Sequence, residues 1–145
     1  MAQAHKSAST ELPGKALGLQ AHSSGELIRQ VGRGFSFSAM RALEARSGIS
    51  LAQIASLIGL PPRTFARRKA SGRLSSEESE KLLRLSAVFE QATELFEGNH
   101  TRALKWLTTP KKALENETPL EYSRTEVGAR EVENLIGRLE HGVFA

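Results

Sequence analysis

The stretch that decides the fold reads LAQIASLIGLPPRTFARRKA and covers residues 51–70. Two helices joined by a tight turn need a small residue at their closest approach, and a residue in the turn that adopts a left-handed backbone. Ala55 meets the first need, and Gly59, four residues later, meets the second. Phe65 stands six residues after Gly59, where the second helix must pack inward. The spacing therefore predicts a helix-turn-helix.

Two features of this stretch depart from the usual pattern. A further apolar residue is expected three positions beyond Phe65, and Arg68 stands there instead. Pro61 and Pro62 follow the turn, although proline suits the first turn of a helix because the N–H that it lacks would have no helical partner. We therefore expect a second helix over about residues 63–70 whose inward face is partly charged.

The remaining chain is predicted to be all-α. Gly and Pro punctuate segments with helical periodicity, and no segment shows the alternation of a strand. Residues 1–23 are rich in small and polar residues and are expected to form a flexible arm. Residues 24–74 hold the helix-turn-helix, 75–98 form a long core or dimerisation helix, and 99–145 form a small helical domain.

The long helix and the last helix carry clear local signals. Ser75 and Glu78 have capping-box spacing, in which each side chain accepts a hydrogen bond from the other residue's backbone N–H. The last helix is expected from about Thr125 to His141. Its apolar residues recur every three or four positions, as on a helix face that packs on a core. They are Val132, Leu135, Ile136 and Leu139.

Charge divides the chain into two unlike halves. Residues 1–74 hold 11 Lys and Arg against 3 Glu, and residues 75–145 hold 9 Lys and Arg against 13 Glu. The halves therefore carry +8 and −4, consistent with the net charge of +4 for the whole chain. A basic half suits a polyanion such as DNA, whereas an acidic half indicates another task.

The second helix of the motif is the candidate recognition helix. Arginine pairs in bidentate fashion with guanine in the major groove, and basic residues at the rim of such a helix bind phosphates. The alternative is a solvated basic helix in a hairpin that binds no DNA. The predicted DNA-contacting residues are Ser50, Gln53, Arg63, Thr64, Arg67, Arg68, Lys69 and Arg73.

Residues 99–143 combine a Trp-Leu pair, proline-punctuated turns and a helix ended by glycine. The elements are Trp106-Leu107, Pro110, Ala113-Leu114, Thr118-Pro119 followed by Glu121, Thr125-Glu126, Gly137 and Gly142. This combination resembles the toxin-binding domain of the Xre/MbcA/ParS family of antitoxins. The basic helix-turn-helix before it is what the Xre branch of that family carries.

The resemblance implies a type II toxin–antitoxin system. The partner would be a RES-domain toxin, which degrades NAD, and the carboxy-terminal region of the antitoxin would obstruct the toxin's NAD pocket. The complex would also bind its own promoter DNA and repress the operon. A homodimer within a hetero-oligomeric complex would present two recognition helices to two half-sites.

The end of the chain offers residues for such a contact. Gly142 ends the last helix, and the apolar Val143 and Phe144 after it could plug a pocket or pack on a partner. Arg138 and His141 stand just before this tail, where positive charge also favours the helix dipole. The predicted toxin-binding residues are Arg130, Glu133, Asn134, Arg138, His141, Gly142, Val143, Phe144 and Ala145.

The residue types present argue against other classes of function. The chain has no Cys and no Asp, and its four His show no metal-ligand spacing. We therefore expect no catalytic residue, metal or cofactor. No apolar run approaches the ~20 residues that span a bilayer, and the first residues lack an apolar signal-peptide core. A cytoplasmic protein that does not associate with membranes is expected.

Two alternatives stay open beside the antitoxin. One is a stand-alone dimeric helix-turn-helix transcription regulator whose carboxy-terminal half only dimerises. The other is an adaptor without DNA activity. An adjacent reading frame that encodes a small RES-like protein would favour the antitoxin, and its absence would weaken that interpretation.

Overall fold

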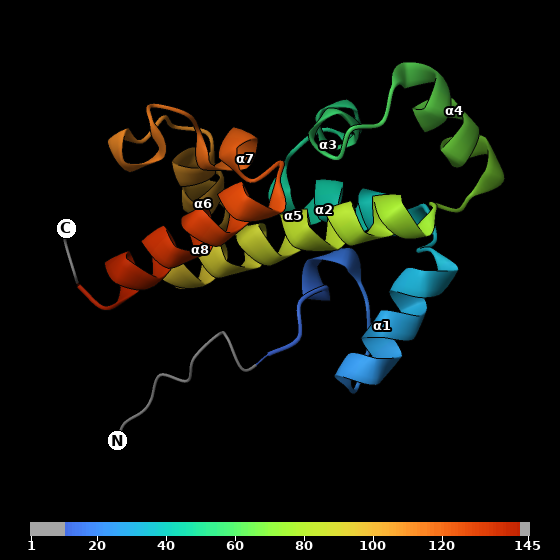
Figure 1. Ribbon diagram of the computed structural model, residues 1–145, viewed down its shortest axis with the longest axis horizontal. Coiled ribbons are helices and arrows are strands. Elements are labelled where there is room, and N and C mark those ends of the chain that lie inside the picture. The colour runs from blue at the N-terminus through green and yellow to red at the C-terminus, as the bar shows by residue number, and fades with distance from the viewer. Residues whose placement is uncertain (1–10, 143–145) are drawn as a thin grey trace.

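The computed structural model describes residues 11–142, and its regular elements in that range are helices (Figure 1). The all-α prediction is confirmed for these residues. In chain order the helices are η2 (Lys15–Leu17), α1 (Ser24–Arg33), α2 (Ser38–Ser47), α3 (Leu51–Leu57), α4 (Pro62–Ser71), α5 (Ser76–Leu95), α6 (His100–Leu107), η3 (Lys112–Leu114), α7 (Pro119–Tyr122) and α8 (Glu126–Glu140).

The long helix α5 lies at the centre, and other helices pack around it. α6 and α8 lie along its carboxy-terminal half, whereas α1, α2 and η2 pack against it from the amino-terminal part of the chain (Figure 1). Leu82, Val88 and Ala92 are completely buried. On α8, the predicted stripe is confirmed, because Val132, Leu135 and Ile136 are buried and Leu139 packs against the core.

The predicted start of α5 is also confirmed. The hydroxyl of Ser75 accepts a hydrogen bond from the N–H of Glu78 at 3.1 Å, and the carboxylate of Glu78 accepts one from the N–H of Ser75 at 2.9 Å. Both bonds satisfy donors that a helix N-terminus would otherwise leave without a partner. The helix that organises the fold is therefore started by a signal that the local sequence carries.

The segment around η2 corrects one expectation. Ala16 and Leu17 are buried, and the carboxylate of Glu90 on α5 accepts hydrogen bonds from the N–H groups of Gly14 at 3.2 Å and Ala16 at 2.7 Å. The prediction of a flexible arm is therefore wrong for this segment, because a distant carboxylate and two small apolar contacts hold it on the core. The first ten residues of the expected arm lie outside the described residues.

Glu90 generates a prediction about pH. Burial raises the pKa of its carboxyl, against the hydrogen bonds from Ala16 and Gly14, which lower it. A carboxyl whose pKa is higher in the folded state stabilises the fold below its unfolded pKa, and that contribution is lost as the pH rises through the folded pKa. We expect Glu90 to make the free energy of unfolding decline as the pH rises from about 4, near the ordinary pKa of Glu, toward neutrality.

Urea unfolding at a series of pH values checks this prediction in the wild type, Glu90→Gln and Glu94→Gln. Glu94 is an exposed glutamate on the same helix and serves as the matched control. The Glu90→Gln protein should lack part of the decline in stability, whereas Glu94→Gln should follow the wild type. Parallel curves for the wild type and Glu90→Gln would show that Glu90 does not titrate in this way.

Candidate functional site

The predicted helix-turn-helix is formed by α3 and α4. Ser50 caps α3, because its hydroxyl accepts a hydrogen bond from the N–H of Gln53 at 3.1 Å. The carbonyl of the buried Ala55 accepts a hydrogen bond from the N–H of Leu60 at 2.8 Å across the turn. Gly59 in that turn has φ +79°, a left-handed conformation that glycine adopts without strain. The role predicted for Gly59 in the turn is confirmed, whereas the role of Ala55 at the closest approach of the two helices stays a prediction.

α4 is held to the rest of the molecule without a buried apolar face. It lies beyond the amino-terminal end of α5, and none of its residues is buried (Figure 1). Phe65 is half-buried, and its ring centroid lies 5.8 Å from that of Phe37. The inward position predicted for Phe65 is therefore occupied, because Phe65 packs against the edge of the core, where it contacts the buried Phe37.

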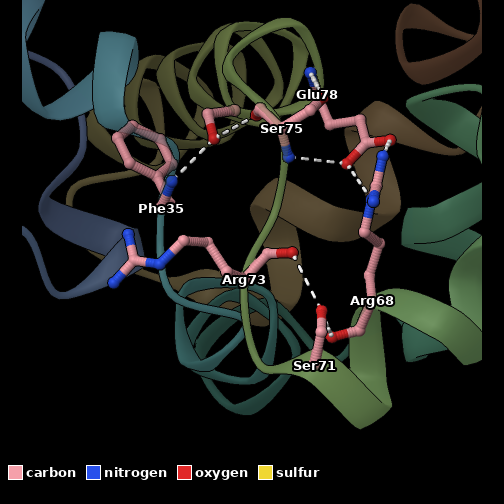
Figure 2. A network of polar contacts seen from close by, with 7 residues as sticks. Phe35, Arg68, Ser71, Arg73, Ser75 and Glu78 are labelled. Atoms are coloured by element: carbon pink, nitrogen blue, oxygen red, sulfur yellow. Dashed lines mark hydrogen bonds and ion pairs between the residues drawn. The ribbon is translucent and has the colours of Figure 1, made fainter.

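Arg68, which stands where an apolar residue is expected, forms a bidentate ion pair with Glu78. Its Nε lies 2.8 Å from Oε1, and its terminal nitrogen lies 3.0 Å from Oε2 (Figure 2). The two side chains are 26% and 13% exposed. The pair joins the last part of α4 to the first turn of α5, so the structure places Arg68 in a contact within the protein.

The electrostatics of this pair keep both groups charged. Burial raises the pKa of Glu78, but hydrogen bonds from Arg68 and Ser75 outweigh it, and the pKa of this carboxyl lies below its ordinary value. The hydrogen bond to Glu78 raises the pKa of the Arg68 guanidinium. Both shifts favour the ionised forms, so the ion pair persists at neutral pH.

Backbone hydrogen bonds tie the end of α4 to the start of α2. The N–H of Phe37 donates to the carbonyl of Gly72 at 2.8 Å, and the N–H of Leu74 donates to the carbonyl of Phe35 at 2.9 Å. Gly34 lets these two backbone segments approach closely, because a Cβ on Gly34 would lie 2.2 Å from the carbonyl oxygen of Leu74. The far end of α4 is therefore anchored through its backbone.

The other predicted DNA-contacting residues lie along α4 and at the start of α3. Ser50 uses its hydroxyl in the cap of α3, and Arg73 donates from one terminal nitrogen to the carbonyl of Gly34 at 2.6 Å. Thr64 is half-buried. The exposed members are Ser50, Gln53, Arg63, Arg67, Lys69 and Arg73. The geometry thus leaves the cations on the outer side of α4 available to a ligand.

Sequence reasoning missed one further cation beside this surface. The guanidinium of Arg41 on α2 lies over the ring of Phe37, 5.3 Å from its centroid, and Phe37 contacts Phe65 on α4. Arg41 is exposed. The sequence carries no signal for this contact, because Arg41 lies on α2, outside residues 51–70, and reaches α4 only through the ring of Phe37.

The predicted partner-binding residues lie mainly on the outer side of α8. They are spaced three and four apart, opposite the buried stripe. Arg130, Asn134, His141 and Gly142 are exposed, whereas Glu133 and Arg138 are half-buried. Val143, Phe144 and Ala145 lie outside the described residues.

Two of these side chains, Arg130 and Glu133, lie close to other charged groups. Arg130 forms an ion pair with Glu126 one turn earlier, with 3.2 Å between nitrogen and oxygen. Burial raises the pKa of Glu133, against the charge of Arg130, which lowers it. Both residues line a shallow groove between α5 and α8 that also includes Arg84. This part of α8 is therefore a mixed-charge surface.

A second groove, of about 410 Å³, opens between α5, α6 and α8. The guanidinium of Arg102 lies 5.1 Å from the ring centroid of Phe96, and the ammonium of Lys111 lies 4.8 Å from that of Trp106. The groove is lined by Leu95, Phe96, Glu97, Arg102, Trp106 and Leu139. Apolar side chains therefore line this groove together with one cation, Arg102, and one carboxylate, Glu97.

Comparison with known proteins identifies both parts of the chain. Residues 26–86 match the antitoxin Xre-like helix-turn-helix domain, and residues 91–142 match the antitoxin Xre/MbcA/ParS C-terminal toxin-binding domain. A relative named Antitoxin Xre from Yersinia enterocolitica serotype O:8 / biotype 1B is 38% identical over 132 residues, which cover 90% of this chain and 89% of that protein. The chain belongs to the Xre family of antitoxins. A second Antitoxin Xre, from Photorhabdus laumondii subsp. laumondii, is 30% identical over the same shares of both chains.

The antitoxin therefore carries a helix-turn-helix domain and a toxin-binding domain, and the resemblance inferred from residues 99–143 is confirmed. The first matched segment ends and the second begins inside α5, so one helix contributes to both domains. The dimerisation role expected for residues 75–98 stays a prediction. Within the described part of the chain, no helix is long and apolar enough to cross a membrane.

Two glycines of α8 provide a matched test of packing in the toxin-binding domain. A Cβ on Gly128 would lie 1.7 Å from the carbonyl oxygen of Tyr122, whereas a Cβ on Gly137 would meet nothing within 4 Å. We expect Gly128→Ala to lower the free energy of unfolding by about 1–3 kcal/mol through overpacking. Gly137→Ala should raise it by roughly 0.5–1 kcal/mol, because alanine favours a helix over glycine. Urea unfolding measures both, and shifts of the same sign would contradict the packing described.

Proposed function

We propose that this antitoxin neutralises a RES-domain toxin that degrades NAD, and that it represses its own operon by binding promoter DNA. The observation that supports both activities is the presence of a helix-turn-helix domain and a toxin-binding domain on one central helix. The RES identity of the toxin follows from the resemblance to the family's Xre branch. We place the protein in the cytoplasm, where both NAD and promoter DNA are found.

DNA binding is supported by the charge and exposure of α4. Arg63 and Arg67 are exposed and lie one turn apart, so both can enter the same groove. Residues 1–74 carry a net charge of +8, which draws this half of the chain toward phosphates. A homodimer within the toxin complex would bring two such helices to two half-sites.

Toxin binding is supported by the outer side of α8 and the chain end after it. α8 is anchored by a buried stripe, so its opposite side is free to form an interface without loss of the core. Gly142 has φ +69°, which ends the helix and redirects the chain. We propose that the residues after it enter the NAD pocket of the toxin and obstruct it.

Truncation tests the toxin interaction. A chain that ends at His141 lacks Gly142, Val143, Phe144 and Ala145 but keeps all of α8. We expect its unfolding midpoint to match that of the full chain and its protection against a co-expressed RES toxin to fall. Cellular NAD and growth are the measurements. Full protection by the truncated chain would show that the tail does not obstruct the toxin.

Alanine substitution tests the recognition helix. Loss of Arg63 or Arg67 should weaken binding to the promoter by roughly 1–3 kcal/mol if each pairs with a base. Arg124→Ala is the control, because Arg124 is exposed in the toxin-binding domain and its replacement removes the same charge. Fluorescence anisotropy with promoter DNA and a scrambled duplex measures the effect. Unchanged promoter affinity in both variants would remove these arginines from the recognition role.

A further inference from the structure

We propose that Glu78 is a positioning residue for DNA recognition, which holds Arg68 and thereby sets the orientation of α4 relative to α5. The proposal rests on the DNA binding proposed above. Nothing in this role requires Glu78 to touch DNA. Its negative charge would in fact repel a phosphate, so the residue can assist DNA binding only through the helix that it holds.

The need for such a residue follows from the surface of α4. A helix on a globular protein is usually held by an apolar stripe. Here none of the ten residues of α4 is buried, and the half-buried ones are Thr64, Phe65 and Arg68. Of these, Phe65 contacts the ring of Phe37 and Arg68 pairs with Glu78. The turn before α4 and the backbone pairing after it anchor only the two ends of the helix. The rotation of α4 about its own axis therefore depends on Phe65 and Arg68.

The geometry of the ion pair suits this task. The guanidinium is planar, and both of its bonds to Glu78 are within normal hydrogen-bond length, at 2.8 and 3.0 Å. A bidentate pair fixes the orientation of the guanidinium as well as its distance from the carboxylate. The ammonium of a lysine at position 68 would fix only the distance. The pair is also largely shielded from solvent, so salt screens it less than an exposed pair.

Glu78 can position Arg68 because its carboxylate is itself held in place. Oε1 of Glu78 also accepts the hydrogen bond from the N–H of Ser75 at 2.9 Å. The carbonyl of Ser75 accepts a hydrogen bond from the hydroxyl of Ser79 at 2.7 Å, and that hydroxyl accepts one from the N–H of Phe35 at 2.7 Å. Figure 2 shows this continuous series of contacts from α4 through the first turn of α5 to the segment before α2.

Two explanations of Arg68 make opposite predictions for Glu78→Gln. If Arg68 contacts a phosphate and Glu78 only competes for it, removing the carboxylate should strengthen DNA binding, because one negative charge is lost and one arginine is released. If Glu78 positions α4, the same substitution should weaken DNA binding. Glutamine can still accept the capping hydrogen bond from Ser75, so α5 keeps its start.

The experiment compares promoter affinity for the wild type, Glu78→Gln, Arg68→Lys and the control Glu77→Gln over a range of salt concentrations. Glu77 is exposed in the same turn of α5 and carries the same charge. We expect promoter binding to weaken by about tenfold in Glu78→Gln and in Arg68→Lys, the order of one charge-assisted hydrogen bond. Glu77→Gln should bind no more weakly than the wild type. The double variant should bind no more weakly than either single variant, because both remove the same contact.

A second measurement separates positioning from failure to fold. Hydrogen exchange of the amides of α4 should accelerate in Glu78→Gln and Arg68→Lys, while exchange in α8 and binding of the toxin stay as in the wild type. Arg68→Lys leaves the capping box intact, so it tests the pair even if Glu78→Gln disturbs α5.

The outcomes distinguish this inference from the proposed function. Promoter binding by Glu78→Gln that equals or exceeds that of the wild type overturns the inference and leaves DNA binding standing. A further variant, Arg68→Gln, removes the charge at this position. If the salt dependence of its promoter binding falls by about one phosphate contact and Glu78→Gln has no effect, Arg68 is assigned to the phosphate backbone instead. A wild type that binds promoter and scrambled DNA equally overturns the proposed recognition, and the inference falls with it.

Discussion

The burial of α5 is the constraint on which the rest of the structure depends. Leu82, Val88 and Ala92 are completely enclosed, because α1, α2 and η2 pack on this helix from one part of the chain and α6 and α8 from the other. A helix of 20 residues is about 30 Å long, so it reaches from α4 to the far end of α8. Since the first matched domain ends and the second begins inside α5, the two domains share this helix and one hydrophobic core.

Two carboxylates on α5 help to hold neighbouring segments against this helix. Glu78 holds the basic α4 through Arg68, and Glu90 holds the backbone around Ala16 in addition to the burial of Ala16 and Leu17. A partly buried carboxylate is costly unless it is paired or hydrogen-bonded. Each of these two carboxylates therefore has its hydrogen-bond partners only while its segment is docked, which favours the docked arrangement over others.

The sequence predicts what is encoded by short spacings. The turn at Gly59 and the capping box of Ser75 and Glu78 were predicted correctly, because each depends on residues within a few positions of one another. The docking of Ala16 was not, because its partner Glu90 lies 74 residues away and no periodicity reports such a contact. The ion pair of Arg68 is intermediate: the anomaly at that position is visible in the sequence, but its partner is not.

That anomaly has a physical logic in a helix whose outer side is basic. A wide apolar stripe on α4 would leave little surface for the exposed cations Arg63, Arg67 and Lys69, and an isolated cation on its inner side would be left without water or a partner. Pairing Arg68 with Glu78 neutralises the inward cation and relieves its repulsion from the neighbours Arg67 and Lys69. The helix thereby stays basic on its outer side and is held by a charge that belongs to the core. In this arrangement the residue that breaks the helix-turn-helix pattern is the one that attaches α4 to α5.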